Sequence, residues 1–198
     1  MELIEQSPVP LAALPVMAFR DHLRLGTGFA DDGIQDAVLE GFLRAAIATV
    51  EGKTAKALIV RSFTLTQTAW RDLAREVFPV APVQAVTRFA IIDPDGTETL
   101  VDPSRYRLIR DGHRPALEST GLLFPTLPVA GRAEIDFDAG FGASWAAVPS
   151  DPAQAVFLLG AHFYERRDGS ESGGRPLPDA VAALIAPHRN LRLFGGRG

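Results

Sequence analysis

The sequence predicts an α+β fold, in which a small helical bundle of about three main helices carries an inserted antiparallel β-sheet or small barrel. Two observations predict it. Apolar residues recur with the helical period up to about residue 60 and again from about residue 148, whereas between these positions they alternate with polar residues at the strand period of two. The 198 residues, 46% of them hydrophobic, suffice for one domain with a sizeable insertion.

Four regions follow from this pattern. We expect an extended N-terminal segment over 1–30, a helical core from 31–60 and 148–189, a β insertion over 61–147 and a C-terminal docking tail over 190–198. The first region lacks a basic start and is interrupted by prolines, so we expect neither a signal peptide nor a membrane-spanning helix there. The expectation is therefore synthesis in the cytoplasm, with no membrane partner.

The first main helix is expected to begin after Asp31 and Asp32, whose carboxylates can cap free N–H groups, and to end at Gly52. Two apolar stripes run side by side along it. Such a width predicts burial on two sides and hence an internal helix. The stripes are formed by Ile34, Val38, Phe42 and Ala45, and by Leu39, Leu43, Ala46 and Val50.

Strands are predicted where apolar residues alternate with threonines and other polar residues. Turn residues separate one predicted strand from the next. The clearest turn is Asp93-Pro94-Asp95-Gly96, in which proline and glycine favour a tight reversal. The predicted strands are 62–68, 83–92, 97–101, 106–109, 116–118 and 132–137.

The second and third helices are expected after residue 148. Ser150 or Asp151 can cap the second, and Pro152 suits its first turn, where no N–H donor is needed. The third begins near Pro178 and Asp179. The predicted core of the helical frame consists of Val38, Phe42, Val50, Val156, Leu159, Phe163 and Leu184.

Chemistry-bearing motifs are few. The chain has no cysteine, so a thiolate metal site is excluded. His162 and Glu165 lie three residues apart on a predicted helix, but no second such pair exists, and we interpret them as a surface pair. We interpret Asp93 and Asp95 as hairpin residues, because no glutamate closes a calcium loop after them. The sequence therefore predicts no catalytic residue, metal or cofactor. A small enzyme stays an alternative, testable by alanine substitutions at His22, His162 and Asp93.

The charge pattern bears on partners. A net charge of −4 argues against a protein that binds DNA tightly through the DNA phosphates. The C-terminal end differs, because it has no acidic residue from His188 onward. It is either a frayed terminus or a segment that orders on a partner through apolar anchors and arginines. The candidate docking residues are Arg189, Leu191, Arg192, Leu193, Phe194 and Arg197.

The order and spacing of several segments resemble one protein family over residues 20–190. A helix leads into a Glu-x-x-Thr-x-x-x-Leu exit, then come a Pro-x-x-Pro-Val strand with an Asp-Gly turn, a tyrosine strand, and a Val-Pro-led helix ending in Phe-Tyr-Glu-x-Arg. The segments are DDGIQDAVLEGFLRAAIATVEGKTAKALI (31–59), FPVAPVQAVTRFAIIDPDG (78–96), Tyr106, FDAGFG (137–142) and LPDAVAALIAPHR (177–189). The pattern resembles the head–tail connector, or adaptor, family of lambda-like siphophages, prophages and gene transfer agents.

The resemblance implies a structural role in the neck of a phage or phage-like particle. Members form a ring, expected to be twelve-fold, beneath the portal protein; the ring extends the DNA channel and receives stopper and tail proteins. The implied partners are the portal, those stopper and tail proteins, further copies of the chain, and passing DNA without sequence-specific binding. The resemblance favours a docking role for the tail over 190–198. A stopper or tail-terminator protein is the nearer alternative, although those proteins are usually shorter and mostly β.

Overall fold

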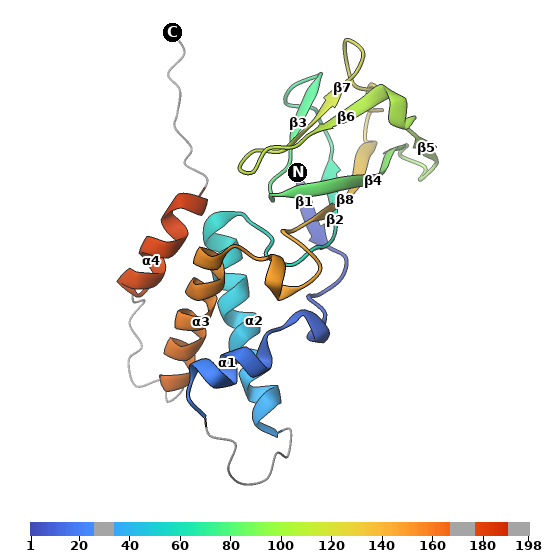
Figure 1. Ribbon diagram of the computed structural model, residues 1–198. Coiled ribbons are helices and arrows are strands. Elements are labelled where there is room, and N and C mark those ends of the chain that lie inside the picture. Colours follow the sequence, from blue (N-terminus) through green and yellow to red (C-terminus); the bar gives the residue numbers. More distant parts are fainter. Residues whose placement is uncertain (26–33, 167–176, 190–198) are drawn as a thin grey trace.

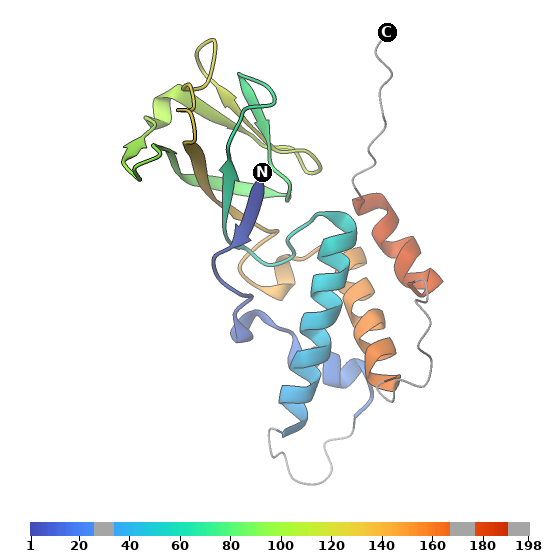
Figure 2. The same cartoon turned by 180° about the vertical axis from the view of Figure 1, so that it is seen from behind.

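The computed structural model describes residues 1–25, 34–166 and 177–189. Helices gather at one end of the molecule and strands at the other (Figures 1 and 2), so the predicted α+β class is confirmed. The α-helices of the described residues are α1 (Val16–His22), α2 (Ile34–Thr54), α3 (Ser150–Glu165) and α4 (Asp179–Ile185). Short 3-10 helices are η1 (Leu11–Ala13), η2 (Pro103–Arg105), η3 (Trp145–Ala147) and η4 (Ala186–His188).

The β part contains two antiparallel sheets. Its strands are β1 (Glu2–Glu5), β2 (Arg61–Gln67), β3 (Arg75–Val77), β4 (Val83–Ile92), β5 (Glu98–Leu100), β6 (Tyr106–Ile109), β7 (Ala116–Ser119) and β8 (Arg132–Ala139). The first sheet has the order β1-β2-β8-β4-β5, and the second has the order β3-β7-β6. Aromatic and aliphatic side chains from both sheets, among them Phe89, Phe137 and Leu117, form one apolar core.

Strict alternation along β2 and β8 gives the larger sheet one apolar and one polar face. Phe63 and Leu65 of β2 are buried, while Ser62, Thr64 and Thr66 between them are exposed or half-buried. Side chains on successive strand residues point to opposite faces, so this pattern leaves hydroxyl groups on the face away from the core. β8 follows the same pattern with acidic residues.

In the helical part, α3 packs against both α2 and α4, and α1 packs against α2. Phe19 of α1 is fully buried and stacks on Phe157 with 5.9 Å between ring centroids. Its ring lies over Gly160 of α3, where a Cβ atom would be only 2.8 Å from Phe19 Cζ. Glycine at this position therefore permits the close approach of α1 to α3.

A buried ionic network holds the helical and β parts together. Arg61 at the start of β2 donates from Nη1 and Nη2 to the two carboxylate oxygens of Glu51 in α2, at 3.0 and 2.7 Å. Its Nη2 also donates to Glu5 Oε2 of β1 at 3.1 Å. Glu51 Oε1 accepts from the backbone N–H of Leu58 at 2.7 Å. One guanidinium thus connects α2, β1 and β2.

Backbone hydrogen bonds also form near this junction. The N–H of Ala57 donates to Ala81 O at 2.9 Å, and the N–H of Gly140 donates to Pro82 O at 2.9 Å. Gly140 has φ of 141°. A Cβ atom there would lie 2.4 Å from Val60 N, so only glycine fits where the chain returns from β8 to the helices.

Three sequence expectations are wrong. The segment over 1–30 is not extended throughout, because residues 16–22 form α1; Pro15 precedes the first helical residue, where proline is tolerated. No side chain caps α3, since its N-cap position is Pro149 and Ser150 already lies in the helix. The first main helix passes Gly52 and ends at Thr54, whose Oγ1 donates to Val50 O.

Candidate interaction surfaces

The sequence-predicted docking tail lies mostly outside the described residues. Leu191, Arg192, Leu193, Phe194 and Arg197 are not described, whereas Arg189 follows η4 and is exposed. His188 Nε2 lies 3.8 Å from Asp151 Oδ2 at the start of α3. The chain therefore reaches residue 189 at the end of the helical part that faces the β part (Figure 1).

The predicted core residues of the helical frame fall into three groups. Val50, Val156 and Leu159 are buried in the helical core. Phe42, Phe163 and Leu184 are half-buried and pack against it, and Phe42 meets Tyr164 edge to face at 5.8 Å between centroids. Val38 is 45% exposed, so its assignment to the core is wrong for the single chain. Its position on α2 faces away from the buried residues Leu39 and Leu43.

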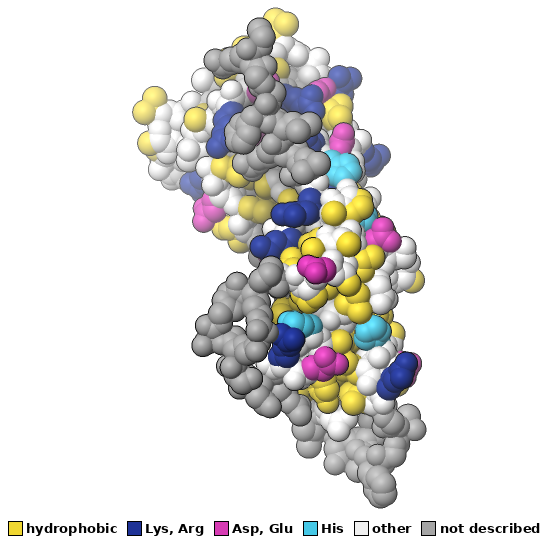
Figure 3. Space-filling model, turned by 90° about the vertical axis from the view of Figure 1, so that its left-hand side faces the viewer, with side chains coloured by type: hydrophobic (Ala, Val, Ile, Leu, Met, Phe, Trp, Pro, Cys, Tyr) yellow, Lys and Arg dark blue, Asp and Glu magenta, His cyan; other side chains and the backbone are white. Residues whose placement is uncertain are grey.

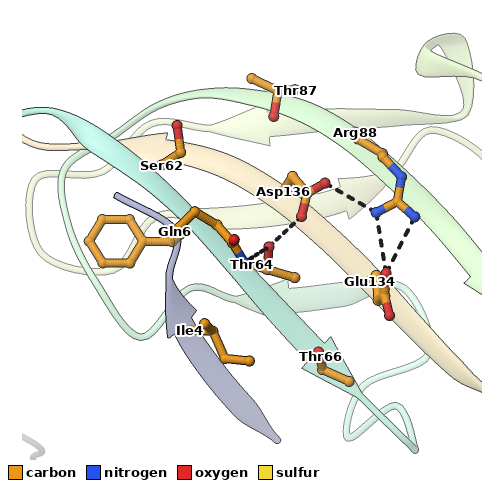
Figure 4. A pocket seen from close by; sticks show the side chains of 10 residues that line it. Ile4, Gln6, Ser62, Thr64, Thr66, Thr87, Arg88, Glu134 and Asp136 are labelled. Carbon is orange, nitrogen blue, oxygen red and sulfur yellow. Dashed lines mark hydrogen bonds and ion pairs between the residues drawn. The ribbon is translucent and has the colours of Figure 1, made fainter. Parts of the chain in front are cut away.

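The polar face of the five-stranded sheet forms a shallow groove of about 560 Å³ (Figure 4). Arg88 of β4 lines one side of it. Its Nε lies 2.9 Å from Glu98 Oε1, its Nη1 3.1 Å from Asp136 Oδ2, and its Nη2 3.3 Å from Glu134 Oε2. Hydrogen bonding to Glu98 foremost, and then to Asp136, raises the pKa of the Arg88 guanidinium above its usual value.

Hydroxyl and amide groups complete the groove. Thr64 Oγ1 donates to Asp136 Oδ1 at 2.6 Å, and Gln6 Nε2 donates to Thr64 Oγ1 at 2.8 Å. Ser62 Oγ donates to Asp138 Oδ1 at 2.7 Å. Asp136 is thus paired with Arg88 and Thr64, Glu134 is paired with Arg88 and Arg132, and no histidine is among the residues that line this groove. The groove is suited to hydrogen bonding with another surface.

The residues considered as catalytic or metal-binding candidates lie on different elements of the fold. The His22 ring lies tilted against Phe157 with 5.5 Å between ring centroids, and His162 lies on α3 beside Phe163. Asp93 forms the predicted hairpin turn, accepting the N–H of Gly96 at 2.9 Å. Among the described residues, no group of three or more His, Cys, Asp or Glu side chains could hold a metal ion. Of the helices described, none has the length and apolar character needed to cross a membrane.

Sequence reasoning missed two features of these surfaces. The sheet-edge strand β1 and the arginine Arg88 were not singled out. Strand β1 has only four residues, too few for a clear alternation. Arg88 stands within a correctly predicted strand, but its partners Glu98, Glu134 and Asp136 come from two other segments. Only the strand register brings them together.

Three solved structures are similar to the chain over its whole length. A chain from the neck of an empty GTA particle computed with C6 symmetry is 53% identical, with a TM-score of 0.90. A chain from the virion of a native gene transfer agent (GTA) particle is 53% identical, with a TM-score of 0.87. A chain from the neck of a native GTA particle computed with C12 symmetry is 48% identical, with a TM-score of 0.86. In all three pairs the match covers 100% of both chains.

No protein-family model matches the chain, and no curated protein matches it. Identity near one half over complete chains, with the same fold, nevertheless establishes common descent with the particle proteins. It agrees with the pattern of segments in the sequence. The chain belongs to the head–tail connector, or adaptor, family of tailed phages and gene transfer agents, whose members are structural proteins of the particle neck and not enzymes.

Proposed function

We propose that this protein is the adaptor of a gene transfer agent or phage neck. It forms a ring under the portal, extends the DNA channel and receives the stopper and tail proteins. The full-length likeness to chains in neck structures, at 48–53% identity, carries this proposal. The C12 symmetry of one of those necks supports a ring of twelve copies.

The helical part favours an adaptor over a stopper or tail terminator. Those proteins are usually mostly β, whereas here α2 and α3 form a frame of 21 and 16 residues. A helical frame gives neighbouring copies rigid surfaces to pack on, while the β part is free to meet the next component. A stopper or terminator role is the outcome that the experiments below would reveal if the adaptor role were wrong.

The electrostatics suit a channel through which DNA slides. The net charge is −4, and on the outer face of the larger sheet Glu134, Asp136 and Asp138 outnumber the arginines Arg88 and Arg132, which are both paired with carboxylates. Tight binding to DNA depends on lysines and arginines that neutralise phosphates. A surface with few unpaired cations offers DNA little to hold, so binding of DNA is expected to be weak and independent of sequence.

The portal contact is assigned to the C-terminal tail. Arg189 is exposed at the end of η4, and the residues after it carry arginines and apolar side chains without a carboxylate. Such a segment can bury its apolar anchors and pair its arginines on a partner. Deleting residues 190–198 should abolish portal binding and leave the rest of the chain folded. Unchanged portal binding by the folded deletion variant would contradict this assignment.

The decisive experiment is analytical ultracentrifugation of the purified protein, alone and with the portal ring from its own gene cluster. Binding to the portal in ring stoichiometry is the expected result. Failure to bind would move the assignment to a stopper or terminator, once DNA-filled heads have been tested as the alternative target. Electron microscopy of particles that lack the protein gives an independent test: loss of an adaptor should leave portals bare.

A further inference from the structure

Helix α2 is apolar on two opposite sides, but the chain covers only one of them. The covered side includes Leu39, Leu43, Ala46 and Val50, which are all buried. The opposite side is exposed over about four turns and consists of Val38, Gly41, Ala45, Ala48 and Gly52. A surface helix of a protein that works alone normally carries charged residues on its outer side. This one carries none there.

The two glycines on the uncovered side are not required by the fold of the single chain. A Cβ atom at Gly41 or at Gly52 would meet nothing within 4 Å. Neither glycine has the positive φ that would exclude other residues. Glycine weakens a helix interior compared with alanine, so the isolated chain gains nothing from either. Glycine does allow the backbone of a second helix to approach closely.

Helix α4 offers a second uncovered side of similar character. Its inner residues Val181 and Ile185 are buried. Its outer residues Ala180 and Ala183 are exposed and uncharged, as are Ala186 and Pro187 of the adjoining η4, while Asp179 in its first turn is exposed and charged. Figure 3, which looks at the molecule from the α4 side, shows hydrophobic side chains gathered over the helical part.

These two sides lie on different flanks of the helical part. Helix α3 packs against both α2 and α4, and it lies between them in Figures 1 and 2. A closed ring of identical copies needs a head-to-tail contact, in which one surface of each copy meets a different surface of the next. Two separate apolar flanks on one helical part meet that requirement, whereas a single flank would lead to a two-fold dimer.

We propose that the uncovered side of α2 packs against the outer side of α4 in a neighbouring copy, and that this contact closes the ring. The occupant is a second copy of this chain, because similar chains stand in necks with C6 and C12 symmetry. This inference rests on the proposed ring function and adds the residues that form it. It also gives Val38 and Ala45, which are exposed in the single chain, a partner in the neighbour.

Cysteine cross-linking tests the contact directly, because the chain contains no cysteine of its own. Two double variants, Ala45→Cys with Ala183→Cys and Ala48→Cys with Ala180→Cys, are bound to the portal ring and oxidised. Covalent multimers on a non-reducing gel are expected from at least one pair, and not from the single variants. Portal-bound protein that stays monomeric on the gel for both pairs would overturn the contact.

Introducing a charged residue tests the same contact without a cross-linking reaction. Gly41→Arg has room in the single chain, so its circular dichroism and thermal midpoint should stay close to wild type. The amount bound in ring stoichiometry on the portal should fall at least tenfold. Gly121→Arg, the same change at an exposed position of the β part, is the matched control and should bind normally.

The outcomes separate the two proposals. If the wild-type protein does not bind the portal, the adaptor function itself fails, and this interface fails with it. If wild type forms the ring while Gly41→Arg binds equally well, the function stands and the α2–α4 contact is wrong.

Discussion

Replacing Arg61 by methionine tests how the two parts of the molecule are held together. The Arg61 side chain is 7% exposed and that of Glu51 is 12% exposed, so their ion pair is largely shielded from water. Burial of the guanidinium alone would lower its pKa. The hydrogen bonds and negative charge of Glu51, followed by those of Glu5, outweigh this effect and raise the pKa of Arg61. Arg61 is therefore charged at every ordinary pH, and methionine removes a charge that its partners require.

The expected loss can be worked from these contacts. Removing one member of a buried ion pair costs about 3–5 kcal/mol, because the remaining charge stays desolvated. Glu51 keeps the N–H of Leu58, and methionine refills part of the volume, so we expect the lower end, about 3 kcal/mol. Glu5 is 40% exposed, and its loss adds less than about 1 kcal/mol. For a chain of this size, 3 kcal/mol corresponds to a fall of roughly 6–12 °C in thermal midpoint.

Thermal and urea unfolding, followed by circular dichroism, measure this loss. Arg107→Met is the matched control, because the Arg107 side chain is 66% exposed and its Glu118 pair at 3.0 Å should contribute less than about 1 kcal/mol. Adding Glu51→Gln to Arg61→Met removes the stranded charge and should restore part of the stability. The reasoning is refuted if Arg61→Met loses no more than Arg107→Met, or if the double variant is less stable than Arg61→Met.

Three further predictions concern stability. Gly160→Ala should destabilise the chain by about 1–2 kcal/mol in urea unfolding, because its methyl group would overlap the buried ring of Phe19. Gly52→Ala, which meets open space, should stabilise the free chain by up to about 1 kcal/mol, and a loss there would contradict the account of α2. Burial foremost raises the pKa of the Glu76 carboxyl, against the opposing hydrogen bond from Gln67. The folded state therefore holds this proton more tightly than the unfolded state, so the contribution is present below pH of about 4.5 and is lost as the pH rises through the folded pKa. Glu76→Gln should remove that loss; parallel stability–pH profiles for the variant and wild type would contradict the assignment.

Much of the β part could be predicted from sequence because alternation and turn residues are local signals. Strands over 83–92 and 106–109 have the predicted bounds, and the Asp93–Gly96 turn forms as expected. Strand β3 was missed because three residues are too few for a period to be seen. Helix α1 was missed because prolines on its N-terminal side disguised a seven-residue helix.

The error at Val38 has a different origin. Sequence periodicity reports which sides of a helix are apolar, but it does not report whether the cover comes from the same chain or from another. The width of the apolar surface on α2 predicted burial on two sides, and the single chain buries only one of them. Within one chain, only the side of Leu39 and Leu43 is covered. The pairing of Arg88 with Glu98, Glu134 and Asp136 was likewise beyond sequence reasoning, since it depends on strand register.

The path of the N-terminal residues has a mechanical consequence. The chain passes between the β part and the helical part three times: from β1 to α1, from α2 to β2, and from β8 to α3. The first crossing is attached along its length, since Gln6 N donates to Ser62 O, Arg44 Nη1 donates to Val9 O, and Val9 and Leu14 are buried among the helices.

Two covalent crossings would leave a hinge that bends about the line joining them, whereas a third, attached crossing removes that freedom. A torque applied to the helices is thus passed to the sheets with little loss. In a closed circle of such units, the tilt of every β part would be set by the helices alone, so all units would present the same angle to whatever docks beneath them.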